Sequence, residues 1–89
     1  MDLFDLTDEP GFSGDELRAI HLLSLATLFI NANRPIRTPD IVKEFYAGRS
    51  PEAAEKAFQR DRHSLALSGV YVEQVRDASG DVGWQLADR

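Results

Sequence analysis

Apolar and polar residues alternate with a helical period in three segments of the chain, and then with the period of a strand near its end. The third helical segment has the most complete signals. Ser50 suits the N-cap, Pro51 the first helical position, and Gly69 the left-handed position after the last turn, so we expect a helix from Pro51 to about Ser68. The side expected to face the core carries Ala54, Ala57, Phe58, Leu65 and Ser68. The opposite side carries polar donors: Lys56, Gln59, Arg60 and His63.

The first helical segment is apolar on more than one side. Ser13 and Glu16 form a capping box, and the helix is expected to end at about Asn31 or Asn33. One stripe is expected to face the core: Leu17, Ile20, Leu23 and Leu28. A second stripe is then left outside: Leu22, Leu25, Ala26 and Phe29. Such a stripe needs a cover, and the candidates are the N-terminal residues, an effector domain, or a second copy of this helix in a homodimer.

A shorter helix is expected between these two, from about Pro39 to Tyr46, with Thr38 as its N-cap. Its predicted buried residues are Ile41, Val42, Phe45 and Tyr46. Residues 47–49 form a short turn that contains glycine. Two helices joined in this way, the second with a face of donors, are typical of a helix-turn-helix.

The last segment predicts a β-hairpin. Residues 70–75 form the first strand, residues 77–81 the turn, and residues 82–86 the return strand, in which Trp84 is expected to anchor the hairpin to the core. The predicted fold is therefore mainly α with a small β-hairpin, a winged helix-turn-helix of three helices and a two-stranded wing over residues 13–89. Residues 1–12 form an acidic tail that also contains apolar residues.

Composition limits the classes of function. The chain has no cysteine, which excludes disulfides and thiolate zinc sites. Its longest apolar run, residues 22–30, is too short to span a bilayer, so we expect a cytoplasmic protein without a membrane partner. His21 and His63 are isolated, and no nucleophile or phosphate-loop motif occurs, so neither a metal or other cofactor nor an enzymatic activity is expected. Asp61 lies near the core side of its helix and is expected to accept hydrogen bonds or to pair with a basic side chain.

The negative charge is concentrated at the N-terminus. The net charge of the chain is −5, and residues 1–16 contain six acidic and no basic residues. Residues 17–89 therefore hold ten basic and nine acidic residues, close to neutrality. A DNA-binding face remains compatible with this balance, although long-range attraction to DNA should be weak.

Several short motifs carry a family resemblance: Phe58-Gln59-Arg60-Asp61, Leu65, residues 69–73 (GVYVE) and residues 83–86 (GWQL). Together with Arg18 and Pro35-Ile36, they resemble the N-terminal winged helix of bacterial WYL-domain regulators and of the related DeoR-type repressors, over residues 17–87. The resemblance implies a bacterial transcription regulator whose third helix enters the major groove of double-stranded DNA.

The sequence thus leads to two hypotheses about function. In the first, base edges are read from the third helix, by Lys56, Gln59, Arg60 and His63, and phosphates are held by Thr38, Lys43, Arg76 and Ser79. In the second, the domain is a protein-binding adaptor or dimerisation module that uses the first helix and the acidic tail. The donors of the third helix favour the first hypothesis, and the acidic balance favours the second.

Overall fold

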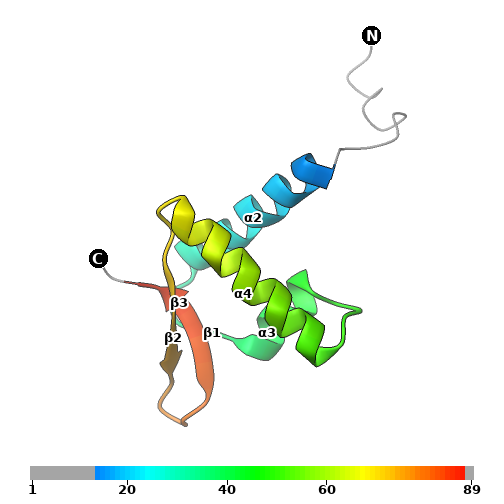
Figure 1. Cartoon of the computed structure of the whole chain (residues 1–89). Coiled ribbons are helices and arrows are strands. Elements are labelled where there is room, and N and C mark those ends of the chain that lie inside the picture. Colours follow the sequence, from blue (N-terminus) through cyan, green and yellow to red (C-terminus); the bar gives the residue numbers. More distant parts are fainter. Residues whose placement is uncertain (1–13, 88–89) are drawn as a thin grey trace, which may run out of the picture.

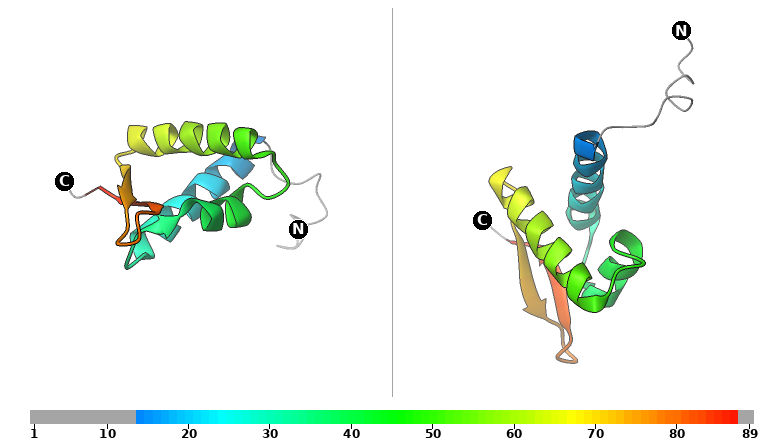
Figure 2. Two further views of the ribbon diagram at one scale, coloured as in Figure 1. Left: turned by 90° about the horizontal axis from the view of Figure 1, so that it is seen from below. Right: turned by 45° about the vertical axis from the view of Figure 1, so that its right-hand side comes forward.

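The computed structural model describes residues 14–87 and contains three helices and three strands within that range. Figure 1 shows their arrangement, in the chain order α2 (Gly14–Asn31), β1 (Ile36–Arg37), α3 (Thr38–Phe45), α4 (Pro51–Leu67), β2 (Val72–Arg76) and β3 (Val82–Leu86). In Figure 2, α4 lies on one side of the domain, α2 and α3 lie on the other, and the hairpin extends from one end. The predicted winged helix-turn-helix is confirmed. Among residues 14–87, no helix has the length and apolar character needed to cross a membrane.

The core forms where α2, α4 and β3 meet. From α2 it takes Leu25, Ala26 and Phe29, and the Phe29 ring stacks on Phe58 of α4 with centroids 6.4 Å apart. The other buried apolar residues come from the remaining elements: Ile41, Tyr46, Ala54, Ala57, Phe58, Leu65 and Trp84. In α3 and the residue after it, Ile41 and Tyr46 are thus buried as predicted.

The predicted orientation of the first helix is wrong. The stripe predicted to be a dimer or partner interface forms the core side of α2: Leu25, Ala26 and Phe29 are buried, and Leu22 packs against them. Leu17, Ile20 and Leu23, which were expected inside, are 46–69% exposed. Hydrophobicity alone does not show which of the two apolar stripes of α2 is buried. The contacts of polar residues on α2 with other elements determine it. Arg18 continues the buried stripe toward the N-terminus, and it reaches a buried carboxylate only when that stripe faces inward.

Both ends of α4 follow the prediction. The Ser50 hydroxyl accepts a 3.2 Å hydrogen bond from the backbone N–H of Ala53, and this satisfies one of the donors that a helix start leaves free. At the other end, Gly69 has φ +90° and Val70 N–H donates to the Leu65 carbonyl at 2.9 Å. A positive φ is readily reached only by glycine, so Gly69 lets the chain turn from α4 into β2.

The start of α3 differs from the prediction by one residue. Its N-cap position is held by Arg37, and no side chain caps the helix there. Thr38 is the first helical residue, and its hydroxyl accepts a 2.9 Å hydrogen bond from Trp84 Nε1. Thr38 therefore fixes the wing to α3 and does not cap α3.

The sheet has three antiparallel strands in the order β1-β3-β2, where two were predicted. Ile36 of β1 and Gln74 of β2 are both register partners of Trp84 in β3. The strand β1 was missed because two residues are too few to show an alternating pattern. It approaches β3 closely: a Cβ added to Gly83 would lie 2.8 Å from Pro35 Cβ.

Candidate nucleic-acid interface

The exposed side of α4 carries the predicted donors. Lys56, Gln59, Arg60 and His63 are all exposed, as expected, and they lie opposite the buried side of the helix, which includes Phe58 and Asp61. α4 begins after a short turn that follows α3, and Gly48 in this turn has φ +85°. This helix therefore presents donors to solvent in the position of the second helix of a helix-turn-helix.

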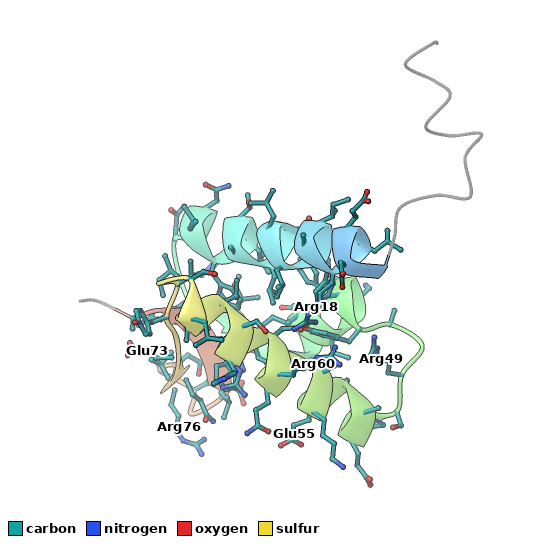
Figure 3. All side chains as sticks on the ribbon, turned by 45° about the horizontal axis from the view of Figure 1, so that its top comes forward. Arg18, Arg49, Glu55, Arg60, Glu73 and Arg76 are labelled. Atoms are coloured by element: carbon teal, nitrogen blue, oxygen red, sulfur yellow. The ribbon has the colours of Figure 1, made fainter. Side chains whose placement is uncertain are left out.

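Acidic residues share this exposed side. Glu52 and Glu55 are exposed in the first two turns of α4 and balance the charges of Lys56 and Arg60. Figure 3 shows Glu55 on the side of α4 that points away from α2, whereas Arg60 lies on the side that faces α2. The positive charge of α4 is thus displaced toward α2.

The four predicted phosphate contacts lie on other elements. Lys43 is exposed on α3, where its ammonium can reach solvent. Thr38 is only partly exposed, and its hydroxyl is already bonded to Trp84. Arg76 and Ser79 are exposed in the hairpin, separate from the donors of α4, and Figure 3 shows Arg76 beside the sheet.

The tip of the hairpin is organised around Asp77. Its Oδ1 accepts hydrogen bonds from the Ser79 hydroxyl at 2.8 Å, the Ser79 N–H at 2.9 Å and the Asp81 N–H at 3.0 Å. Its Oδ2 lies 3.0 Å from Arg37 Nη2, which is also 3.2 Å from Asp81 Oδ2. The Ser79 hydroxyl is the main cause that lowers the Asp77 pKa to about 2. Arg76 donates to the Gly80 carbonyl at 2.8 Å, so both predicted contacts in the hairpin already have partners within it.

A buried polar cluster links α2, α4 and the end of α3. Asp61 is fully buried, and its Oδ2 accepts hydrogen bonds from the Tyr46 hydroxyl at 2.7 Å and from His21 Nε2 at 2.8 Å. Its Oδ1 accepts a 2.8 Å hydrogen bond from Arg18 Nη1, while Arg18 Nη2 donates to the Ser64 hydroxyl at 2.8 Å. The expectation that Asp61 accepts hydrogen bonds and pairs with a basic side chain is confirmed.

These donors set the charge states in the cluster. Burial alone would raise the Asp61 pKa, but hydrogen bonds from Tyr46, Arg18 and His21 outweigh it and hold that pKa below its ordinary value. Asp61 is therefore ionised at neutral pH and can only accept hydrogen bonds. In the hydrogen bond between them His21 must be the donor, so its Nε2 carries a proton. Burial and the neighbouring carboxylate raise the pKa of the Tyr46 hydroxyl. The hydroxyl therefore keeps its proton and donates a hydrogen bond to Asp61.

Arg62 is held by aromatic rings on the wing side of α4. Its guanidinium carbon lies 4.1 Å from the centroid of Trp84 and 4.8 Å from that of Phe58, within the range of a cation–π interaction. Burial lowers the Arg62 pKa, and its Nε atom is buried without a hydrogen-bond partner among residues 14–87. We assign Arg62 to the packing of the wing on α4.

Sequence reasoning did not identify Arg18, His21 and Tyr46 as the partners of Asp61. His21 was taken as isolated because its partner Asp61 is 40 residues away in the chain. A usable signal existed in the spacing of α2, where Arg18 lies one turn before Leu22 and two turns before Leu25 on the same stripe.

Comparisons of this chain with protein-family models, with curated proteins and with solved structures find no match.

Proposed function

We propose that this domain binds double-stranded DNA as the DNA-binding part of a transcription regulator, with α4 in the major groove. The observation that supports this most directly is the exposure of Lys56, Gln59 and Arg60 on one side of a helix that follows a short turn. Arg and Gln are suited to paired hydrogen bonds with guanine and adenine, respectively. The resemblance of the sequence to WYL-domain and DeoR-type regulators supports the same proposal. In this arrangement the exposed Lys43 holds a phosphate, and the hairpin lies against the backbone.

Selection from a random duplex library at low salt, followed by fluorescence anisotropy with the enriched duplex, tests the proposal. Gln59→Ala is the sharpest variant, because Gln59 is exposed, has no ionic role and leaves the net charge unchanged. We expect it to weaken binding by about 1–3 kcal/mol and to relax the preference at one base pair. Asn33→Ala, which removes an exposed amide outside α4 and the hairpin, is the matched control and should leave affinity unchanged. Failure of the full chain to enrich any duplex would refute the proposal.

A second function is favoured by the outer side of α2. Ile20, Leu23 and Ile30 are exposed there, by 46–69% of their surface. Between Arg18 and Arg34 the only ionisable residue is His21, so this side of α2 exposes apolar surface to solvent with almost no charged group. An exposed apolar surface of this kind is typical of a protein contact. We propose that a second copy of the chain covers it, which would also pair two α4 helices for a palindromic DNA site.

A further inference from the structure

Three arginines from three different parts of the fold meet beside the buried carboxylate. Arg18 comes from α2, Arg49 from the turn before α4, and Arg60 from α4 itself. Figure 3 shows the three labelled side chains close together between α2 and the first half of α4. They line a hollow of about 400 Å³ together with Leu17, His21, Tyr46 and Asp61. We call this hollow the arginine pocket.

The charge of the arginine pocket is not balanced by its own residues. Asp61 is the only acid among the described residues that line it, against three guanidinium groups. Asp61 already accepts three close hydrogen bonds, from Arg18, His21 and Tyr46 at 2.7–2.8 Å. Arg60 Nε lies 3.6 Å from Asp61 Oδ1, which is too far for a good hydrogen bond. Three guanidinium groups thus share one carboxylate, and among residues 14–87 Arg49 has no carboxylate within 4.0 Å.

Arg49 and Arg60 hold most of the unused donors. The guanidinium carbon of Arg49 lies 5.9 Å from the centroid of the Tyr46 ring, at the outer limit of a cation–π contact, and Arg49 is exposed. Arg60 is 59% exposed, so its terminal nitrogens reach solvent. Arg18 is fixed by Asp61 and Ser64, and it gives the pocket a rigid wall. A guanidinium group can hold a phosphate by two parallel N–H···O hydrogen bonds.

We propose that the arginine pocket binds a phosphate group and that, given the proposed function, this group is a backbone phosphate of the DNA that α4 enters. Two observations favour DNA as the source. Lys56 lies one turn before Arg60 on the exposed side of α4, so the pocket continues the donor face of that helix. Arg49 lies in the turn between α3 and α4, directly before the N-terminal end of α4, and the N-terminal residues of a recognition helix lie closest to the DNA. The pocket, and not the hairpin tip with its two aspartates, is then the main phosphate contact of the domain.

The first arm of the test uses inorganic phosphate and the full chain, without DNA. Arginine side-chain NMR signals are followed during a phosphate titration in low-salt buffer. We expect saturable shifts of Arg49 Nε and Arg60 Nε, and roughly tenfold weaker binding for Arg49→Gln, which removes one charged donor and leaves the Asp61 cluster intact. Arg34→Gln removes the same charge from an exposed position outside the pocket and should leave phosphate binding unchanged. Absence of saturable shifts at Arg49 and Arg60 would overturn the proposal, whether or not the domain binds DNA.

The second arm measures how DNA affinity depends on salt. Loss of one phosphate contact should reduce the slope of log K against log salt by about 0.9, equally for all duplex sequences. We expect this change for Arg49→Gln and not for Arg34→Gln. An unchanged slope for Arg49→Gln would overturn the assignment to backbone phosphate. If phosphate saturates the pocket while no duplex binds, the anion site stands and the proposed function fails, so the two failures can be told apart.

Discussion

Trp84 Nε1 donates a 2.9 Å hydrogen bond to the hydroxyl of Thr38, which joins the middle of β3 to the first residue of α3. The same indole meets the Phe58 ring edge-on, with centroids 5.0 Å apart and the planes at 85°. Trp84 thus contacts both helices of the helix-turn-helix from the wing, and it fixes how the wing is held against α4.

The packing of Trp84 predicts a large loss of stability on truncation. Trp84 is 92% buried, so Trp84→Ala should lower the free energy of unfolding by about 3–5 kcal/mol, a large part of the stability of a small domain. Trp84→Phe keeps a ring against Phe58 but loses the hydrogen bond to Thr38, and it should cost less. Urea denaturation followed by far-UV circular dichroism measures both variants. An unchanged midpoint for Trp84→Ala would contradict this role of the indole.

The Asp61 cluster predicts a loss of stability in acid. The folded-state pKa of Asp61 is lowered, so its contribution is complete above the unfolded-state pKa of about 3.9 and disappears as the pH falls through the folded-state pKa. Asp61→Ala at pH 7 leaves Arg18, His21 and the Tyr46 hydroxyl without their acceptor and should cost about 3–5 kcal/mol. Its remaining stability should depend less on pH than that of the wild type.

Urea denaturation between pH 7 and pH 3 measures this dependence. Asp40→Asn, an exposed change on α3, should keep the acid sensitivity of the wild type. Equal slopes for Asp61→Ala and the wild type would show that other carboxylates cause the loss.

Local signals explain which parts of the fold were predictable. Ser50 and Gly69 determine the backbone around them, so both ends of α4 could be placed from the sequence. The exposed donors of α4 followed from its period in the same way. The partners of Asp61 could not be identified locally, because Arg18 and His21 lie at least 40 residues away in the chain. The predicted orientation of α2 was wrong for the same reason, because the side of α2 that faces inward carries Arg18 and His21, whose partner is distant in the chain.

The contact between β1 and β3 makes Gly83 sensitive to substitution. A Cβ at this position would meet Pro35 Cβ at 2.8 Å, and the proline ring has little freedom to move away. Gly83→Ala should therefore destabilise the domain by about 1–3 kcal/mol through overpacking, and weaken the pairing of Arg37 with Gly83. Urea denaturation and amide hydrogen exchange in β1 provide the measurements. Gly14→Ala, where nothing lies within 4 Å of the added Cβ, should be neutral or slightly stabilising. Equal stability of the two variants would rule out a close contact at Gly83.

The two sides of α2 should respond in opposite ways to the same chemical change. Leu25 has 0% exposure, so Leu25→Glu buries a charge without a partner and should unfold the domain. Leu23 is 69% exposed, so Leu23→Glu should leave the fold unchanged, with an unfolding midpoint close to that of the wild type below the concentration at which dimers form. Circular dichroism distinguishes the two variants. A folded Leu25→Glu variant would overturn the orientation of α2.

Leu23→Glu also tests the proposed homodimer. Ile20, Leu23, Thr27 and Ile30 follow one another at intervals of three, four and three residues, the spacing of the seam between two packed helices. The Thr27 hydroxyl donates to the Leu23 carbonyl at 2.8 Å, so it can be buried in such a seam without losing its hydrogen bond. We expect the wild type to dimerise at micromolar concentration and Leu23→Glu to remain monomeric in light scattering, while Gln74→Glu, with the same added charge on the sheet, dimerises normally. The variant without residues 1–12 shows whether these residues or a second copy of the chain cover the seam. If residues 1–12 cover it, the wild type remains monomeric and the shortened variant dimerises.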